Sequence, residues 1–437
     1  MEREEILSPG KKIRKIRKDF KINQQDITGG EITRNLISIV ENGKANLTPK
    51  VAFILSENIN RVCKEKNIDF QVSTDYLLED IETQANKIMD KYMEALKADD
   101  ISLEKLNYLS RDIESFILEY PMSNNKAAVY SLIGDLYLHL NETFKAYKFF
   151  LKSYEHLIVD KNILGIIAVL LNLSYCSLVQ NNYDETLYFN NLAYIYVNDM
   201  DEDTLYRFYN NSINAFIATN RVDDALNTIK IAETKLSVFF SCNKEAYWKI
   251  LSLKSSALKS KKYFNDTLKI QKKLFSSYPK ESPELKLQSI CEFIDVYISI
   301  KDIKNVSMLL TNNEALINTY CQEEFTKDSN KIFYSLALAY EFISSKDNAK
   351  KFFLLAIDSS KAFDSANCLS QILSSYFDFM EINSLDDDIN DFKNELLTLI
   401  AIDKVSRSSN LILKLIKHYT NTEESEYINH ILSFILD

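Results

Sequence analysis

The sequence predicts an all-α protein in which a small N-terminal helical domain precedes a long array of helical hairpins. Helix breakers are scarce, because the 437 residues include only six glycines and five prolines. Apolar residues recur along most of the chain at the spacing of amphipathic helices. The chain is also too long for one ordinary compact core, which favours several domains or a repeat array.

Two helices are expected at the start of the chain. The first begins after Ser8, a capping residue followed by a proline at the first helical position, and ends near Phe20. Asn23 can cap a short second helix, which Gly29 and Gly30 would close. Together they form the support on which a third helix can be presented.

The third helix is predicted between Thr33 and Glu41. The Thr33 side chain can accept an N–H one turn into the helix, and Gly43 supplies the left-handed residue that ends it. Its apolar face consists of Leu36, Ile37 and Val40. The side chains that then point away from the core are Arg34, Asn35 and Ser38. A short helix with a polar N-terminal part, set behind another helix and a turn, has the form of a DNA-recognition helix.

These residues resemble the Cro/repressor-type helix-turn-helix family. The match consists of Ile32-Thr33-Arg34, Ile37-Ser38, Glu41-Asn42-Gly43-Lys44, Ala52 and Leu55, and it covers roughly residues 7–70. The resemblance implies a DNA-binding domain in residues 1–70, called the head from here on. The DNA-binding residues that it implies are Gln24, Thr33, Arg34, Asn35, Ser38 and Lys44. Of these, Arg34, Asn35 and Ser38 match the base-reading surface of the family, and Gln24 and Lys44 match its backbone-contact surface.

The charge of the chain is unevenly divided. The whole chain has a net charge of −10, but the head has 14 basic and 10 acidic residues (+4), and the remainder has 38 basic and 52 acidic residues (−14). Salt screens charges over about 8 Å, so a basic head can bind DNA beside an acidic body. Some basic residues of the first helix are expected to contact phosphates. These residues are Lys11, Lys12, Arg14, Lys15, Arg17, Lys18 and, just beyond the helix, Lys21.

Residues 71–125 are expected to form a connector of two helices. Thr74 or the next residue can cap a long helix that reaches about Leu96, and its broad apolar stripe suits packing on both sides. The second helix is predicted from Ser102 to Leu118, ending before Pro121.

From residue 126 onward the chain repeats. The first unit is marked by Tyr130, Ile133, Gly134, Tyr137, Ala146 and Phe150. Looser copies give unit starts near residues 127, 167, 206, 247, 287 and 330, a period of about 40 residues. The pattern resembles the tetratricopeptide repeat, in which helical hairpins stack into a right-handed superhelix. Residues 126–437 are therefore expected to be a repeat domain that ends in a capping hairpin, which could also pair with a second subunit.

The tetratricopeptide pattern turns certain positions of the first helix of each unit towards a concave groove. In the third unit these positions include Arg207, Asn210 and Asn214, where the amides suit an extended peptide backbone and the guanidinium suits a carboxylate. The full set of predicted peptide-binding residues is Asn172, Tyr175, Arg207, Asn210, Asn211, Asn214, Gln288, Asp295 and Tyr334.

No motif for catalysis, metal binding or phosphate binding is recognisable. The four histidines lack metal-ligand neighbours, the six cysteines lie at least 30 residues apart, and no glycine-rich phosphate loop occurs. We therefore expect reduced thiols, no metal, no cofactor and no enzymatic activity. No signal peptide opens the chain, and the longest apolar run, Ile163–Leu171, is about half of a membrane span. A soluble cytoplasmic protein is expected.

A Cro-type head followed by a tetratricopeptide array resembles the peptide-responsive quorum-sensing regulators of Gram-positive bacteria, the RRNPP group. The resemblance implies a homodimeric transcription regulator whose array binds a short imported signalling peptide. The peptide would change the spacing of two heads, and hence the affinity for an inverted-repeat operator in double-stranded DNA. Two alternatives stay open. The array could receive a protein partner, or the chain could be a groove-blocking or phosphatase-like relative, against which the intact head argues.

Overall fold

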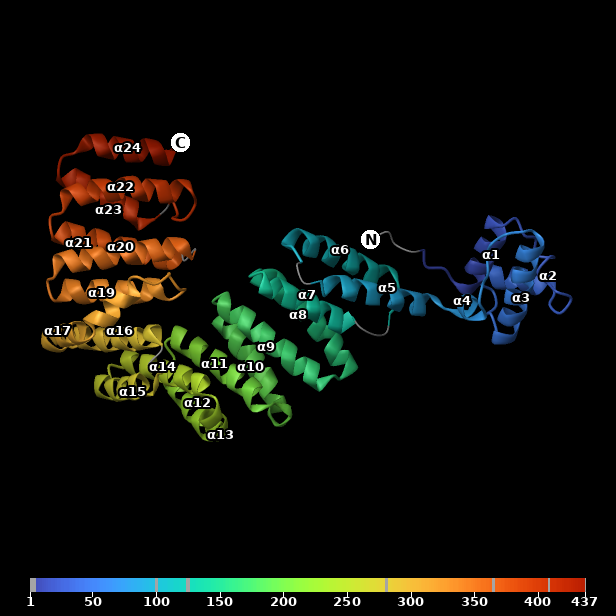
Figure 1. Cartoon of the computed structure of the whole chain (residues 1–437), viewed down its shortest axis with the longest axis horizontal. Coiled ribbons are helices and arrows are strands. Elements are labelled where there is room, and N and C mark those ends of the chain that lie inside the picture. Colours follow the sequence, from blue (N-terminus) through green and yellow to red (C-terminus); the bar gives the residue numbers. More distant parts are fainter. Residues whose placement is uncertain are drawn as a thin grey trace. The chain divides into compact units, whose positions relative to one another are not determined.

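The computed structural model is helical throughout the residues that it describes, which are 5–98, 101–122, 126–279, 282–363, 366–407 and 409–436. This confirms the predicted all-α class; Figure 1 gives the helix labels. The chain divides into two compact units, Met1–Arg221 and Val222–Asp437. From here on, "first unit" and "second unit" mean these two parts of the chain and no longer single repeats. The division falls inside the predicted repeat region. The predicted domain bounds near residues 70 and 125, and the right-handed superhelix, stay predictions.

Three helices form the head, in the first unit. They are α1 (Pro9–Asp19), α2 (Arg34–Glu41) and α3 (Pro49–Glu65). Thr33 caps α2 as predicted, and Thr48 caps α3; each side chain accepts the N–H three residues further on. Ser8 precedes α1, but its side chain makes no capping hydrogen bond. The apolar faces meet in a core that includes the fully buried Ile13 and Leu55.

The short helix predicted after Asn23 is not present. Residues 24–27 form turns instead, and the Asp26 carboxylate accepts the N–H of Asn23 at 2.9 Å. Gly29 and Gly30 then follow with positive φ. The prediction is wrong because Asp26 closes a local turn on Asn23 and the glycines leave too few residues to nucleate a regular helix.

The long connector helix predicted up to Leu96 is broken in two. The parts are α4 (Thr74–Leu78) and α5 (Ile81–Leu96). Ser73 caps α4, whereas the Asp80 carboxylate accepts the N–H of Thr83 at 2.7 Å and starts α5. This second cap competes with continuation of the first helix, and Glu79 between them is extended. The next helix, α6 (Leu103–Glu119), lies where it was predicted, and the Ser102 side chain caps it by accepting the N–H of Lys105.

The first unit continues with helical hairpins. Its further helices are α7 (Lys126–His139), α8 (Thr143–Asp160), α9 (Ile163–Val179), α10 (Tyr183–Ala193), the 3-10 helix η1 (Tyr194–Asp199) and α11 (Glu202–Ala218). Gly134 lets the Phe150 ring of α8 pack directly on α7, since a Cβ at residue 134 would lie 2.7 Å from that ring. The predicted Gly134 and Phe150 signature therefore marks a real hairpin joint.

The second unit consists of further hairpins. Its helices are α12 (Val222–Lys235), α13 (Ser237–Cys242), α14 (Lys244–Ser260), α15 (Phe264–Ser277), α16 (Pro283–Ser299), α17 (Ile303–Asn312), α18 (Glu314–Tyr320), α19 (Ser329–Phe342), α20 (Lys346–Ala362), α21 (Ala366–Ile382), α22 (Asp386–Ala401), α23 (Asn410–Asn421) and α24 (Ser425–Leu436). Figure 1 shows α19 to α24 as a stack. The hairpin of α21 and α22 was not recognised in the sequence pattern. The short helices η1, α13 and α18 lie between hairpins and lengthen the repeats that contain them.

The turns inside the described hairpins share one conformation. In each hairpin, the second residue after the first helix has positive φ. The N–H of the following residue donates to the carbonyl oxygen five residues before it, which is a Schellman motif. The left-handed residues are Asn141, Asn181, Asn220, Lys262, Lys301, Ser344, Ser384 and Glu423. None is glycine, so each turn accepts the steric cost of a side chain in this region.

Candidate functional site

The N-terminal part of α2 is open to solvent. Arg34 and Asn35 are exposed and Ser38 is half-buried, while Ile37 and Val40 on the opposite face are buried in the head. Thr33 is exposed at the start of the helix, where its side chain accepts the N–H of Leu36 at 3.2 Å. Lys44 is exposed just beyond the end of the helix. The structure thus places polar side chains of α2 on one accessible surface.

A buried carboxylate joins α1, the turn at residues 24–27 and α2. Glu41 accepts hydrogen bonds from Arg17 Nε (2.5 Å) and Nη2 (2.7 Å), and from Gln24 Nε2 (2.9 Å). Burial opposes ionisation, but these hydrogen bonds hold the pKa of Glu41 below its usual value. Gln24 Oε1 also faces Arg34 Nε at 3.5 Å. Arg17 and Gln24 therefore orient α2 from within the head.

Lys12, predicted on the basic outer face, is buried under the connector. Its Nζ donates to the carbonyls of Tyr76 (2.7 Å) and Glu79 (3.0 Å) and to Glu79 Oε2 (3.3 Å). Burial lowers the pKa of Lys12, although Glu79 acts in the opposite direction. Lys12 and Arg17 are thus removed from the predicted phosphate-contacting set. The basic residues that stay exposed there are Lys11, Arg14, Lys15, Lys18 and Lys21.

Two predicted groove asparagines link the first helices of neighbouring hairpins. Asn172 of α9 donates to the Asp135 carboxylate of α7 at 3.1 Å. Asn211 of α11 is buried and donates to Ser174 of α9 at 3.0 Å. The Asn211 amide faces a helix rather than a groove, so we correct its assignment to helix packing. Repeat spacing predicts which helix lines the groove. An error of one residue in aligning the repeat, however, places a side chain on a different face of that helix.

The other predicted residues of α11 share one face. Arg207 is exposed and pairs with Asp203 one turn earlier at 2.8 Å. Asn214 donates to the backbone carbonyl of Asn210 at 2.7 Å. The Asn210 Oδ1 atom is buried and has no hydrogen-bond partner among the described residues. Such an acceptor is costly to leave unpaired. Tyr175 is exposed on α9.

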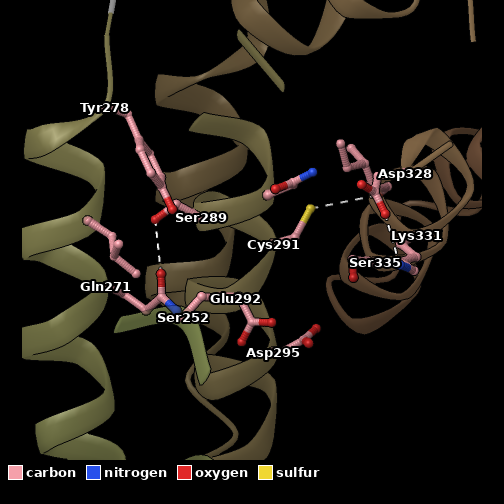
Figure 2. A pocket seen from close by; sticks show the side chains of 13 residues that line it. Ser252, Gln271, Tyr278, Ser289, Cys291, Glu292, Asp295, Asp328, Lys331 and Ser335 are labelled. Carbon is pink, nitrogen blue, oxygen red and sulfur yellow. Dashed lines mark hydrogen bonds and ion pairs between the residues drawn. The ribbon is translucent and has the colours of Figure 1, made fainter. Parts of the chain in front are cut away.

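In the second unit, a cavity of about 230 Å³ lies between α14, α15, α16 and α19. Its wall includes two of the predicted residues, Gln288 and Asp295. Figure 2 shows Asp295 and Glu292 on one side of this cavity and Lys331 on the other. The predicted Tyr334 does not line it, and its hydroxyl lies 2.7 Å from that of Ser375 on α21.

An ion cluster lies at the edge of this cavity. Lys259 Nζ of α14 is 3.0 Å from Glu292 Oε2 and 3.2 Å from Asp295 Oδ2, both on α16. Burial raises the pKa of Asp295 and Lys259 opposes that shift. Burial would by itself lower the pKa of Lys259, but the two carboxylates raise it. The cluster therefore holds two carboxylates for one cation.

Asp295 also belongs to a second, larger cavity. That cavity has a volume of about 580 Å³ and extends along α16 and α19. Its lining residues are Lys259, Asp295, Ile298, Ser299, Leu338, Glu341 and Phe342. Sequence reasoning missed Lys259, Glu292 and Glu341 as groove residues.

Within the described residues, no three His, Cys, Asp or Glu side chains are placed to hold a metal ion. No helix in the same ranges is long and apolar enough to span a membrane. Asp386, Asp387 and Asp388, which the sequence shows as an acidic run, lie in the first turn of α22. Carboxylates at a helix N-terminus stabilise the helix, which accounts for their position.

No protein-family model and no curated protein matches the sequence. Among solved structures, the chain is similar to a signal transduction ATPase with numerous domains (STAND) with a tetratricopeptide repeat sensor from Pyrococcus horikoshii, at 13% identity and a TM-score of 0.38, over 89% of this chain and 75% of that one. It is also similar to Bacillus thuringiensis PlcR in complex with the peptide PapR7 and DNA, at 11% identity and a TM-score of 0.29, over 82% of this chain and 95% of that one. At these scores function has to be argued from the residues of this chain.

Proposed function

We propose that the protein is a cytoplasmic, non-enzymatic, DNA-binding transcriptional regulator, and that a short peptide bound by the hairpin array modulates its operator affinity. The observation that carries the proposal is the exposed polar end of α2, held by the Glu41 network on a head of net charge +4. Arginine recognises guanine and asparagine recognises adenine through paired hydrogen bonds in the major groove. Arg34 and Asn35 supply both groups.

Base contacts and phosphate contacts should respond differently to substitution. Asn35→Ala should lose about 1–3 kcal/mol of binding free energy for the preferred sequence only. Lys44→Ala should weaken binding to all duplexes alike and reduce the salt slope by about one. Anisotropy titrations with a selected operator and a scrambled duplex, each at several salt concentrations, measure both effects. If the wild-type protein binds no duplex at low salt, DNA binding is refuted.

We infer that the active species is a homodimer that binds an inverted repeat. Two heads related by a twofold axis would each read one half-site, so the symmetry of the operator would follow that of the protein. Light scattering over a range of protein concentrations, with and without operator DNA, tests this. A monomer under all these conditions would contradict it.

For the peptide we infer an extended conformation of under about ten residues along the first helices of the hairpins. The unpaired Oδ1 of Asn210 supports a contact in the first unit. Asn210→Ala should weaken peptide binding roughly tenfold, because it removes one acceptor. DNA binding without peptide should be unchanged, while more peptide is needed to alter it, because the two sites are linked. A variant that responds to peptide like the wild type would exclude this position.

A further inference from the structure

Carboxylates from successive first helices gather on one face of the second unit. Asp295 of α16 and Glu341 of α19 line the same 580 Å³ cavity. Asp378 of α21 lies close enough to Glu341 for its charge to raise the pKa of that group, to which burial makes the larger contribution. Three neighbouring helices thus each contribute a carboxylate.

Lysine side chains neutralise the carboxylates at the two ends of this face but not the one in the middle. At one end Lys259 of α14 pairs with Asp295, and at the other Lys414 of α23 pairs with Asp378 at 2.5 Å. Glu341 lies between them, and no cationic side chain of the described residues forms an ion pair with it. The protein therefore retains a partly buried carboxylate with a like charge as its neighbour and no counterion of its own.

The cavity beside Glu341 also has Lys259 in its lining, where that cation is paired with Glu292 and Asp295, and much of the remaining wall is apolar. The apolar walls are formed by Ile298 of α16 and by Leu338 and Phe342 of α19, all half-buried. A lysine or arginine side chain has an aliphatic stem and a charged end, so it can pack on such walls while its head reaches a carboxylate. A neutral aliphatic side chain would gain only the apolar contacts with these walls, and an acidic side chain would be repelled by Glu341.

We propose that this cavity binds a lysine or arginine side chain of the peptide, with Glu341 accepting hydrogen bonds from the charged head and Ile298, Leu338 and Phe342 packing on the stem. The proposal rests on the proposed peptide-binding function and specifies its ligand as a basic peptide. The net charge of −14 outside the head attracts a ligand of the same class over longer distances.

Three pools of fluorescein-labelled heptapeptides test this subsite. Both termini are blocked, every position but the central one is randomised, and the central residue is arginine, norleucine or glutamate. Each pool is titrated by anisotropy into the full-length wild type, Glu341→Gln and Glu341→Asp. Glu324→Gln, in an exposed loop of the same unit, removes the same charge outside the cavity and is the matched control.

The arginine pool should bind the wild type about tenfold more tightly than the norleucine pool, and the glutamate pool should bind weakest. Glu341→Gln should abolish the preference for arginine without weakening the norleucine pool. Glu341→Asp and Glu324→Gln should keep the preference, which separates loss of the charge from a general folding defect.

Equal affinity of the wild type for the arginine and norleucine pools would overturn the subsite and leave peptide binding intact. A Glu341→Gln variant that keeps the preference would do the same. If no pool binds the wild type, both the subsite and the peptide half of the proposed function are refuted.

Discussion

The head and the hairpin array are both helical, but different interactions stabilise them. In the head, the buried charges of Lys12 and Glu41 each find several internal partners, and Gly10 lets α1 approach the α2 backbone closely. In the array, aromatic rings fill the joints, such as Phe353, whose centroid lies 5.4 Å from those of Tyr376 and Phe379. A few irreplaceable contacts therefore determine the geometry of the head, whereas the array distributes its stability over many similar contacts.

The largest difference should come from removing one charge in each region. Glu41→Ala leaves Arg17 without its buried partner and should lower the free energy of unfolding of the head by about 3–5 kcal/mol. The matched array variant, Asp203→Ala, breaks the exposed pair with Arg207 and should cost under about 1 kcal/mol. Hydrogen exchange with mass spectrometry reports protection of α2 and α11 separately. Similar losses in the two helices would contradict the comparison.

Glycine substitutions sharpen the comparison at the backbone. Gly10→Ala places a Cβ 2.0 Å from the Val40 carbonyl oxygen, which cannot rotate away, so α1 and α2 must separate at a cost of about 1–3 kcal/mol or more. Gly134→Ala meets only the Phe150 ring, at 2.7 Å, and alanine favours the helix. We expect clearly reduced protection in α1 for the first variant and a smaller change in α7 for the second. The reverse order would refute the assigned roles.

Acidification should affect the two regions in opposite directions. The folded-state pKa of Glu41 lies below its usual 4.5, so the stability it contributes is present above pH 4.5 and is lost as the pH falls through the folded value. Burial raises the pKa of Asp295 above its usual 3.8, so the folded state binds that proton more readily and gains stability as the pH falls towards 3.8. Hydrogen exchange below pH 4.5 should therefore show α2 weakening before α16. Glu41→Gln should remove the acid sensitivity of α2.

The smallest effect concerns the left-handed turns. Lys262→Gly relieves a side chain at φ 62° and should stabilise the second unit by up to about 1 kcal/mol, less the entropy that glycine adds to the unfolded chain. Gly43→Ala, at φ 69° after α2, should destabilise the head by a similar amount. Trp248 on α14 is the single tryptophan and reports urea unfolding of the second unit. A lower urea midpoint for Lys262→Gly would contradict the steric argument.

Local features of the fold were predictable from sequence, because they depend on residues three or four positions apart. The caps at Thr33 and Thr48 are of this kind. The hairpin joint of Gly134 and Phe150 joins residues 16 positions apart and was predictable because the repeat pattern includes both. The burial of Lys12 was not predictable, since its partner Glu79 lies 67 residues later and lysines in a basic run are usually solvated.

The candidate groove was predictable only in part. Repeat spacing indicated the helices that line it, and it included Asp295. Lys259 and Glu292 are 33 residues apart, on the first helices of successive hairpins, and opposite charges on successive first helices are a signal that could have paired them. The helix predicted after Asn23 is absent, because Asn23 belongs to a turn in which Asp26 accepts its N–H. A cap-like residue alone therefore did not predict a helix.

The buried Lys12 determines which part of the chain moves as one body. Its three hydrogen bonds, to Tyr76 of α4 and to Glu79 between α4 and α5, are joined by two between Leu7 and Gln84, at 3.2 and 2.8 Å. Rotating the head against α5 would strand a desolvated ammonium group at a cost of about 3–5 kcal/mol. Under the proposed function, a change in head spacing would therefore start beyond α5. A 16-residue helix is about 24 Å long, so a tilt of about 10° at its far end would displace the head by roughly 4 Å.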